Sequence, residues 1–254
     1  MAAPEALRRL QDRRVLLTGG GSGIGRATAV RLVAEGARVV AADVSEEGLA
    51  ATRDEVDDPD RLLLRPLDVS DEDAVVAGVA EAVEALGGLD VLVNLAGVHV
   101  TTPIGSLEVA DVRRLLEVNL IGTMLMCREA VPHLGDGGVI VNTASSSATH
   151  GNPYMGAYAA SKGGVLAFSL TLAAELSDRG VRVVPISPGG VATPLSRGPS
   201  EAFKTLDASY YARIMPYRGL GRPEDIAGAI AFAASDDGAY LNGAELRVDG
   251  GAHT

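Results

Sequence analysis

The fold is decided by residues 14–43, RVLLTGGGSGIGRATAVRLVAEGARVVAAD. A short apolar run over 14–18 leads into a glycine-rich turn, and an amphipathic helical pattern follows as far as Glu35. A second apolar run then ends at Asp43. Glycines let a backbone turn tightly and approach a diphosphate, while the first turn of a helix offers free N–H groups and a positive dipole end. The stretch therefore predicts a strand, an anion-binding turn, a helix and a second strand.

The glycines of the turn are spaced GxxxGxG, through Gly19, Gly23 and Gly25. Asp43 follows at the end of the second strand, where a carboxylate can accept both ribose hydroxyls of an adenosine. The same carboxylate would repel the extra phosphate of NADP by about 4 kcal/mol at about 4 Å, before screening by salt. We therefore expect a dinucleotide site that prefers NAD, although Arg26 and Arg38 are near enough in sequence to weaken the preference.

Apolar runs and helical patterns alternate along the rest of the chain. Runs without polar alternation, separated by helices, indicate a parallel sheet that is covered on both faces. The expected fold is a doubly wound α/β fold with a mostly parallel, seven-stranded sheet. Pro185 interrupts one predicted central strand, where a missing N–H donor is disfavoured. The five later runs are RLLLRPLD (61–68), LDVLVN (89–94), GVIVNTAS (138–145), VRVVPIS (181–187) and ELRVD (245–249).

Composition limits the possible partners. The chain has 254 residues, 47% of them hydrophobic, and no linker separates two apolar halves, so we expect one domain over 1–254. A net charge of -11 disfavours nucleic acid and anionic lipid as partners. Neither a signal peptide nor an apolar run of roughly 18 residues is present, and Cys127 is the only cysteine. These features predict a soluble cytoplasmic protein without a disulfide.

One long segment, 193–218, lies outside the alternation and is rich in aromatic residues. A long connection of this kind in a compact domain is usually functional. We interpret it as a lid over a substrate pocket, with a helical excursion packed on the surface as the alternative. Its large side chains are Phe203, Tyr210, Tyr211, Met215 and Tyr217.

Tyr158 and Lys162 are four residues apart near the start of a predicted helix. Positions i and i+4 share a helix face, so the ammonium group is expected close to the phenol. A neighbouring cation favours the phenolate and lowers its pKa toward a value useful at neutral pH. The pair predicts an acid/base tyrosine; the alternative is a surface pair that only stabilises the helix.

Two more polar residues are candidates for the same site. Ser145 follows an apolar run at the carboxyl edge of the predicted sheet, and its hydroxyl could hold a substrate oxygen. Ser146 and Ser147 remain alternatives by chemistry alone. Asn119 falls on the apolar stripe of a predicted helix and therefore points inward. It could hold a water for proton relay, or it could be a core residue whose amide is satisfied locally.

Together these residues resemble the short-chain dehydrogenase/reductase family, over essentially the whole chain. The resemblance rests on the order and spacing of TGGGSGIG (18–25), NLAG (94–97), SPGGVATP (187–194) and VDGG (248–251). It implies a Rossmann-type fold and hydride exchange between NAD(H) and a carbonyl or secondary alcohol. Leu95 departs from the family pattern, which has Asn there, and this puts one local hydrogen bond in doubt.

The resemblance also implies the site residues. The catalytic tetrad of the family falls on Asn119, Ser145, Tyr158 and Lys162, with Lys162 poising Tyr158 and Asn119 linking Lys162 to solvent through water. Members commonly form homotetramers through the helices that carry Asn119 and Tyr158. Cofactor contacts are implied for Gly19, Ser22, Gly23, Ile24, Gly25, Asp43, Asp68, Val69, Asn94, Ala96, Gly97, Tyr158, Lys162, Pro188, Gly189, Val191 and Thr193.

The sequence leaves other functions open. One alternative is a 3-oxoacyl-thioester reductase acting on an acyl carrier protein, although Asp43 speaks against its usual NADPH. Another is an NAD-binding sensor or scaffold without turnover. The aromatic segment suggests an apolar or cyclic substrate. We interpret His99 and His150 as rim or packing residues and Cys127 as a buried helix residue, and find no metal-ligand spacing in the chain.

Overall fold

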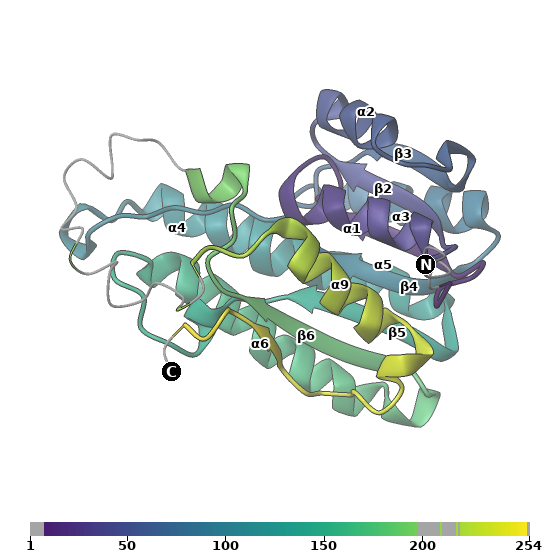
Figure 1. Cartoon of the computed structure of the whole chain (residues 1–254). Helices are drawn as coiled ribbons and strands as arrows, with labels where there is room; N and C mark the ends of the chain where they lie inside the picture. Colours follow the sequence, from purple (N-terminus) through teal and green to yellow (C-terminus); the bar gives the residue numbers. More distant parts are fainter. Residues whose placement is uncertain (1–7, 198–208, 210–216, 218, 253–254) are drawn as a thin grey trace.

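The computed structural model describes residues 8–197, 209, 217 and 219–252. In this part of the chain, seven parallel strands form one sheet in the order β3-β2-β1-β4-β5-β6-β7 (Figure 1). The prediction of a seven-stranded, mostly parallel sheet is confirmed. The strands are β1 (Arg14–Thr18), β2 (Arg38–Asp43), β3 (Leu62–Pro66), β4 (Leu89–Asn94), β5 (Leu134–Thr143), β6 (Arg182–Pro188) and β7 (Leu246–Val248).

Helices cover both faces of the sheet (Figure 1). One face carries α1 (Gly23–Ala34), α2 (Glu46–Asp54) and α9 (Pro223–Ala234). The other face carries α3 (Glu72–Leu86), α5 (Gly122–Ala130) and α6 (Gly156–Glu175). A helix α4 (Val109–Leu115) continues into α5 through a π-helical turn, Leu116–Ile121. Short 3₁₀ turns cover Pro59–Arg61, Ile104–Ser106, Val131–His133, Ser146–Ala148, Ser177–Arg179, Pro194–Arg197 and Asp236–Gly238.

The five inner strands β1, β2, β4, β5 and β6 supply both cores, which explains their continuous apolar sequences. In β1, Val15 and Leu17 join the core beneath α1 and α9, while Leu16 joins the core beneath α3, α5 and α6. Successive side chains of a strand point to opposite faces, so a strand buried on both sides has no polar alternation. The carboxyl ends of these strands, with the loops that follow them, therefore form one continuous edge for a site.

Pro185 fits the sheet because its missing N–H faces a gap in the pairing. The carbonyl of Ile186 accepts a hydrogen bond from the N–H of Ala144, directly after β5, so the residues on either side of Ile186 direct their backbone groups away from β5. On that side β7 pairs only from Ile186 onward. Two residues before Pro185, the N–H of Val183 donates to the side chain of Asn242, and its carbonyl accepts from the N–H of Gly243. Neither partner belongs to a strand. Proline at 185 therefore removes no ladder hydrogen bond.

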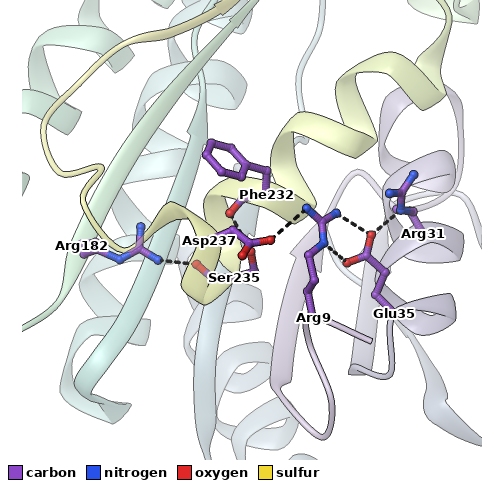
Figure 2. A network of polar contacts seen from close by, with 7 residues as sticks. All are labelled: Arg9, Arg31, Glu35, Arg182, Phe232, Ser235 and Asp237. Atoms are coloured by element: carbon purple, nitrogen blue, oxygen red, sulfur yellow. Dashed lines mark hydrogen bonds and ion pairs between the residues drawn. The ribbon is translucent and has the colours of Figure 1, made fainter. Parts of the chain in front are cut away.

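An ion network fixes the amino edge of the sheet, away from the carboxyl ends (Figure 2). Both Glu35 oxygens accept hydrogen bonds from Arg9, each at 2.7 Å, and Arg31 contacts the same carboxylate. Burial alone raises the pKa of Glu35, but the hydrogen bonds from the two guanidinium groups bring it below its usual value. Arg9 also lies 3.6 Å from Asp237, which joins the end of α1 to the segment after α9.

Most of the predicted lid, 193–218, lies outside the described residues, including Phe203, Tyr210, Tyr211 and Met215. Within the described part of that segment, Thr193 is buried and Tyr217 is exposed. None of the helices in the described chain combines the length and apolarity needed to cross a bilayer.

Candidate active site

The glycine-rich turn between β1 and α1 is too tight for side chains. A Cβ atom on Gly25 would lie 1.9 Å from the carbonyl oxygen of Gly19, and one on Gly19 would lie 2.7 Å from the nitrogen of Ala96. The first turn of α1 holds no acidic residue, and the hydroxyl of its N-cap residue, Ser22, makes no capping hydrogen bond. Backbone N–H groups and the positive helix end therefore meet at a place that suits an anion.

Asp43 lies beside this turn at the end of β2. One carboxylate oxygen accepts a hydrogen bond from the N–H of Gly21 at 2.9 Å, and the other accepts one from Ser45 at 2.9 Å. These two bonds hold the carboxylate in one orientation. Each carboxylate oxygen can accept more than one hydrogen bond, so both oxygens keep capacity for a ribose hydroxyl.

The two arginines that cast doubt on NAD are engaged elsewhere. Arg26 donates to the carbonyl of Gly21 at 2.7 Å and pairs with Glu55 at 2.9 Å. Arg38 begins β2, at the opposite edge from Asp43, and donates to the carbonyl of Leu86 at 3.3 Å. Both guanidinium groups are thus held by partners within the protein.

Three other residues implied as cofactor contacts, Val69, Asp68 and Asn94, differ from one another in their surroundings. Val69 is buried against α5, where a Cβ on Gly122 would lie 2.8 Å from its methyl group. Asp68 is exposed and accepts a hydrogen bond from the N–H of Ser70 at 2.9 Å. The side chain of Asn94 turns into the sheet and donates to Asn142 at 2.9 Å. The structure thus gives Asn94 a cross-strand contact between β4 and β5, not a place facing the site.

Thr18 ties the loop after β4 to the cofactor turn, a role that the sequence reasoning missed. Its hydroxyl accepts hydrogen bonds from the N–H groups of Leu95 and Ala96, both at 3.2 Å. The available signal was a buried threonine directly before the first glycine of the turn. Because backbone N–H groups make these bonds, Leu95 in place of the usual Asn leaves them intact.

The segment after β6 reaches the same turn. A Cβ on Gly23 would lie 3.2 Å from the side chain of Thr193, so these residues are neighbours. Val191 is buried and forms an isolated bridge with Gly221. Gly189 is required by another contact, since a Cβ there would lie 2.7 Å from the Cα atom of Asp249. Pro188 ends β6 directly before it.

Tyr158 and Ser145 meet at the carboxyl edge of the sheet. Ser145 follows β5, and its hydroxyl accepts a hydrogen bond from the N–H of Ser147 at 3.1 Å. Burial raises the pKa of Tyr158, and a hydrogen bond with the Ser145 hydroxyl lowers it in part. This direction is opposite to the lowered pKa expected from the sequence, because desolvation of the phenolate is the dominant effect. Ser147 instead accepts a hydrogen bond from Asn152 at 2.6 Å, whereas Ser145 is the serine that acts on the Tyr158 phenol.

Lys162 lies one helical turn after Tyr158 and is buried. Its Nζ donates to the carbonyl oxygen of Thr143, the last residue of β5, at 2.7 Å. Burial lowers the pKa of Lys162 to about 8. An ammonium group has three donors, so two remain for ribose hydroxyls.

Asn119 lies in the π-helical turn between α4 and α5 and is fully buried. Its Oδ1 accepts a hydrogen bond from the N–H of Val98 at 2.8 Å, and its Nδ2 donates to the carbonyl of Val98 and the hydroxyl of Ser161, both at 3.0 Å. Both amide protons are thus used within the protein. The contacts support a clamp on the loop after β4 more directly than a donor to a relay water.

His99 also belongs to the site, although the sequence suggested only a rim or packing residue. Its ring lies 4.6 Å from that of Tyr158, centroid to centroid, at an interplanar angle of 77°. Burial lowers the pKa of His99, so the imidazole is neutral at neutral pH. No sequence signal pointed to this contact, because His99 lies in the loop after β4 and Tyr158 in the first turn of α6.

The residues at this edge fit a dinucleotide. A Cβ atom at Gly19 or Gly25 would collide with the backbone of the turn or of the loop after β4, and the Asp43 carboxylate accepts a hydrogen bond from the turn. Near the other end, the hydroxyls of Thr143 and Ser187 are buried without a hydrogen-bond partner among the described residues. They lie at the carboxyl ends of neighbouring strands, β5 and β6. Within the described chain, no three His, Cys, Asp or Glu side chains are grouped as metal ligands.

Comparisons with known proteins agree with this geometry. Residues 19–253 match a family model described as enoyl-(acyl carrier protein) reductase. The chain is 37% identical to levodione reductase of Leifsonia aquatica, over 96% of this chain and 95% of that one. It is 38% identical to 3beta-hydroxysteroid dehydrogenase 1 of Eggerthella lenta, over 95% and 94% of the two chains.

A solved structure gives the same result. A short-chain dehydrogenase from Burkholderia cenocepacia J2315, in complex with NADP, superposes with a TM-score of 0.88 and 35% sequence identity. The match covers 97% of this chain and all of that one. With the fold, the turn and the Tyr158–Lys162 helix in place, the chain belongs to the short-chain dehydrogenase/reductase family of oxidoreductases.

Proposed function

We propose that the protein interconverts a secondary alcohol and a ketone with NAD(H), and that Tyr158 is its acid/base group. The observation that carries this proposal is the proximity of the Ser145 hydroxyl to the Tyr158 phenol, whose pKa it lowers in part, one helical turn from buried Lys162. A hydroxyl and a phenol can then hold the same substrate oxygen. Bound NAD(H) would accept or donate the hydride.

Each residue has a distinct task in this proposal. Tyr158 gives its proton to the carbonyl oxygen during reduction and takes the proton back during alcohol oxidation. Ser145 donates a hydrogen bond to the same oxygen. Lys162 holds ribose hydroxyls with its remaining donors, and its charge offsets part of the cost of forming a buried phenolate. Asn119 keeps the loop at Val98 in place.

The preference for NAD rests on Asp43. Its carboxylate is fixed beside the turn by Gly21 and Ser45, and Arg26 is committed to Glu55. A phosphate on the ribose would meet this carboxylate without a compensating cation among the described neighbours. The NADP bound to the Burkholderia relative makes this the point to test first. NAD contacts are proposed for Asp43, Lys162 and the turn from Gly19 to Gly25, and for Asp68, Val69, the backbone of Asn94, Ala96, Gly97, Tyr158, Pro188, Gly189, Val191 and Thr193.

The substrate is proposed to be an apolar or cyclic alcohol or ketone. The similarity to a hydroxysteroid dehydrogenase supports a cyclic alcohol. A second candidate is reduction of the keto group of a 3-oxoacyl thioester carried by an acyl carrier protein, since the matched family description also names a carrier-protein substrate. Asp43 weighs against that candidate where the reductant is NADPH. An NAD-binding sensor without turnover would bind NAD and leave every substrate unchanged.

The test is cofactor absorbance with a panel of cyclic, steroidal and aliphatic alcohols and ketones, together with an oxoacyl thioester. NAD(H) and NADP(H) are run in parallel. We expect turnover with NAD(H) on an apolar or cyclic substrate. Turnover only with NADPH and the thioester would establish the second candidate. NAD binding without turnover on any substrate would favour the sensor.

Assembly and location complete the proposal. Exposed apolar side chains lie on α4, on α5 with the π-helical turn before it, and on α6, and they support a homotetramer formed through these helices. Sedimentation should give a tetramer, and a monomer would contradict this part. The reducing cytoplasm suits a chain whose only cysteine, Cys127, is a buried free thiol. The exposed side chains are Val109, Ile121, Met124 and Leu170.

A further inference from the structure

The loop after β4 passes directly behind the proposed catalytic groups. Gly97 is close to them, since a Cβ there would lie 3.1 Å from Oδ1 of Asn119 and 3.6 Å from Nζ of Lys162. The next residue, Val98, is clamped through both its N–H and its carbonyl by the Asn119 amide. Four residues further on, the N–H of Thr102 donates to the carbonyl of Tyr154 at 2.8 Å. His99 is therefore carried by a loop that is fixed on both sides of it.

This loop places the His99 ring against the ring of Tyr158, at 4.6 Å and nearly perpendicular. Aromatic pairs prefer this edge-to-face arrangement at such centroid separations. His99 is half-buried, and burial lowers its pKa, so its ring meets the phenol as a neutral aromatic group. The contact restricts the side-chain rotation of Tyr158 without adding a charge beside Lys162.

The backbone of Tyr158 is linked to the same clamp. Ser161 donates from its hydroxyl to the carbonyl oxygen of Tyr158 at 2.8 Å, and Asn119 donates to the hydroxyl of Ser161 at 3.0 Å. A continuous series of contacts therefore runs from the Tyr158 carbonyl through Ser161, Asn119 and Val98 to His99. The ring contact between His99 and Tyr158 closes this series.

We propose that His99 is a positioning residue that holds the Tyr158 ring in its orientation toward Ser145, through aromatic contact rather than through its nitrogen atoms. This inference rests on the proposed acid/base function of Tyr158. A phenol free to rotate would spend less time at the distance from Ser145 at which both groups can hold one substrate oxygen.

The first test compares three substitutions of His99. His99→Leu removes the ring at similar volume, His99→Phe keeps an aromatic ring, and His99→Asn keeps a polar group alone. We expect His99→Leu and His99→Asn to lower kcat about 3- to 10-fold, with the KM for NAD unchanged. His99→Phe should restore kcat to within about threefold of the wild type. His133→Leu, on the far exposed turn before β5, is the matched control and should change nothing.

Two outcomes would overturn the proposal. The first is an unchanged kcat in His99→Leu, which would show that the ring contact does not matter. The second is rescue by His99→Asn but not His99→Phe, with the change confined to the KM of the alcohol or ketone. That pattern would assign His99 to substrate hydrogen bonding instead.

A second measurement does not depend on turnover, so it separates this inference from the proposed function. Protein labelled with 3-fluorotyrosine gives a ¹⁹F resonance for Tyr158, assigned by its absence in Tyr158→Phe. We expect one narrow Tyr158 resonance in the wild type and in His99→Phe, and a shifted, broadened or split one in His99→Leu. An unchanged resonance in His99→Leu would refute the positioning role even if no substrate were found. If His99→Leu failed to fold, the comparison of His99→Phe with His99→Asn would decide.

Discussion

The amide of Asn119 forms two hydrogen bonds with the backbone of Val98, one accepted from the N–H at 2.8 Å and one donated to the carbonyl at 3.0 Å. The pair joins the π-helical turn before α5 to the loop that follows β4. The Asn119 side chain is fully buried. It therefore fixes the middle of the site loop, between the hydrogen bonds of Thr18 to Ala96 and of Thr102 to Tyr154.

Replacement of Asn119 by Leu should destabilise the protein by roughly 2–4 kcal/mol, because it leaves several buried polar groups without partners. Asn119→Asp keeps an acceptor for the N–H of Val98 but loses both donors. At neutral pH it should lower the free energy of unfolding less than the leucine variant only if the carboxylate becomes protonated. The free energy of unfolding in urea measures both effects. A loss below about 0.5 kcal/mol in Asn119→Leu would show that the clamp is not needed for stability.

The cofactor preference can be changed at Asp43. Asp43→Ser removes the acceptor that Gly21 and Ser45 hold in place, and should raise the KM for NAD by about 10- to 100-fold, as expected for lost hydrogen bonds to a charged group. Adding Val44→Arg supplies a cation for a ribose phosphate and should make NADP the better cofactor. Asp54→Asn, at the end of α2, is the matched control. Equal use of NAD and NADP by the wild type would contradict the account of Asp43.

The buried charge of Lys162 should appear in the pH dependence of stability. Because burial holds its pKa at about 8, against 10.5 for an ordinary lysine, the folded state binds fewer protons than the unfolded state between these values. The penalty is fully present below pH 8 and is relieved as the pH rises, so the wild type gains stability from this group in that window.

Lys162→Met removes the penalty, and unfolding without added dinucleotide measures the difference. The stability of the variant relative to the wild type should decrease between pH 7 and pH 9.5 by on the order of 2 kcal/mol. Above that range the raised pKa of Tyr158 adds an opposing effect, so the comparison stops there. A constant difference between the two proteins across this window would mean that Lys162 titrates normally.

A side chain at position 97 should lower the activity. The Cβ of Gly97→Ala would press on Oδ1 of Asn119 at 3.1 Å and approach Nζ of Lys162 at 3.6 Å. We expect kcat to fall about 3- to 10-fold, because displacement of a positioned group by a fraction of an ångström slows an oriented reaction. Gly105→Ala, where a Cβ meets nothing within 4 Å, is the control and should keep full activity.

Much of the fold could be predicted from the sequence because local signals agreed with the global fold. Apolar runs marked the strands, and the turn at Gly19–Gly25 marked the first crossover. Pro185 could not be explained from the sequence, because its tolerance depends on where β7 begins to pair with β6.

The site was predictable only as far as its residues follow local patterns. The spacing of Tyr158 and Lys162 marked one helix face, but the contact of His99 with Tyr158 joins the loop after β4 to α6 through tertiary packing. The direction of the Tyr158 pKa was also wrong from sequence, because the proximity of Lys162 was visible there and the depth of burial was not. Asn94 lies where the family motif places it, but the hydrogen bond of its side chain to Asn142 could not be predicted from the sequence.

The central claim is that Tyr158 exchanges the proton, and the turnover of Tyr158→Phe with NAD(H) on a substrate from the panel tests it most directly. Tyr240→Phe, at a fully exposed position, is the control. We predict that Tyr158→Phe keeps the NAD affinity and the unfolding midpoint of the wild type but loses at least about 10²-fold in kcat. A kcat within about threefold of the wild type would contradict the assignment of Tyr158 as the acid/base group.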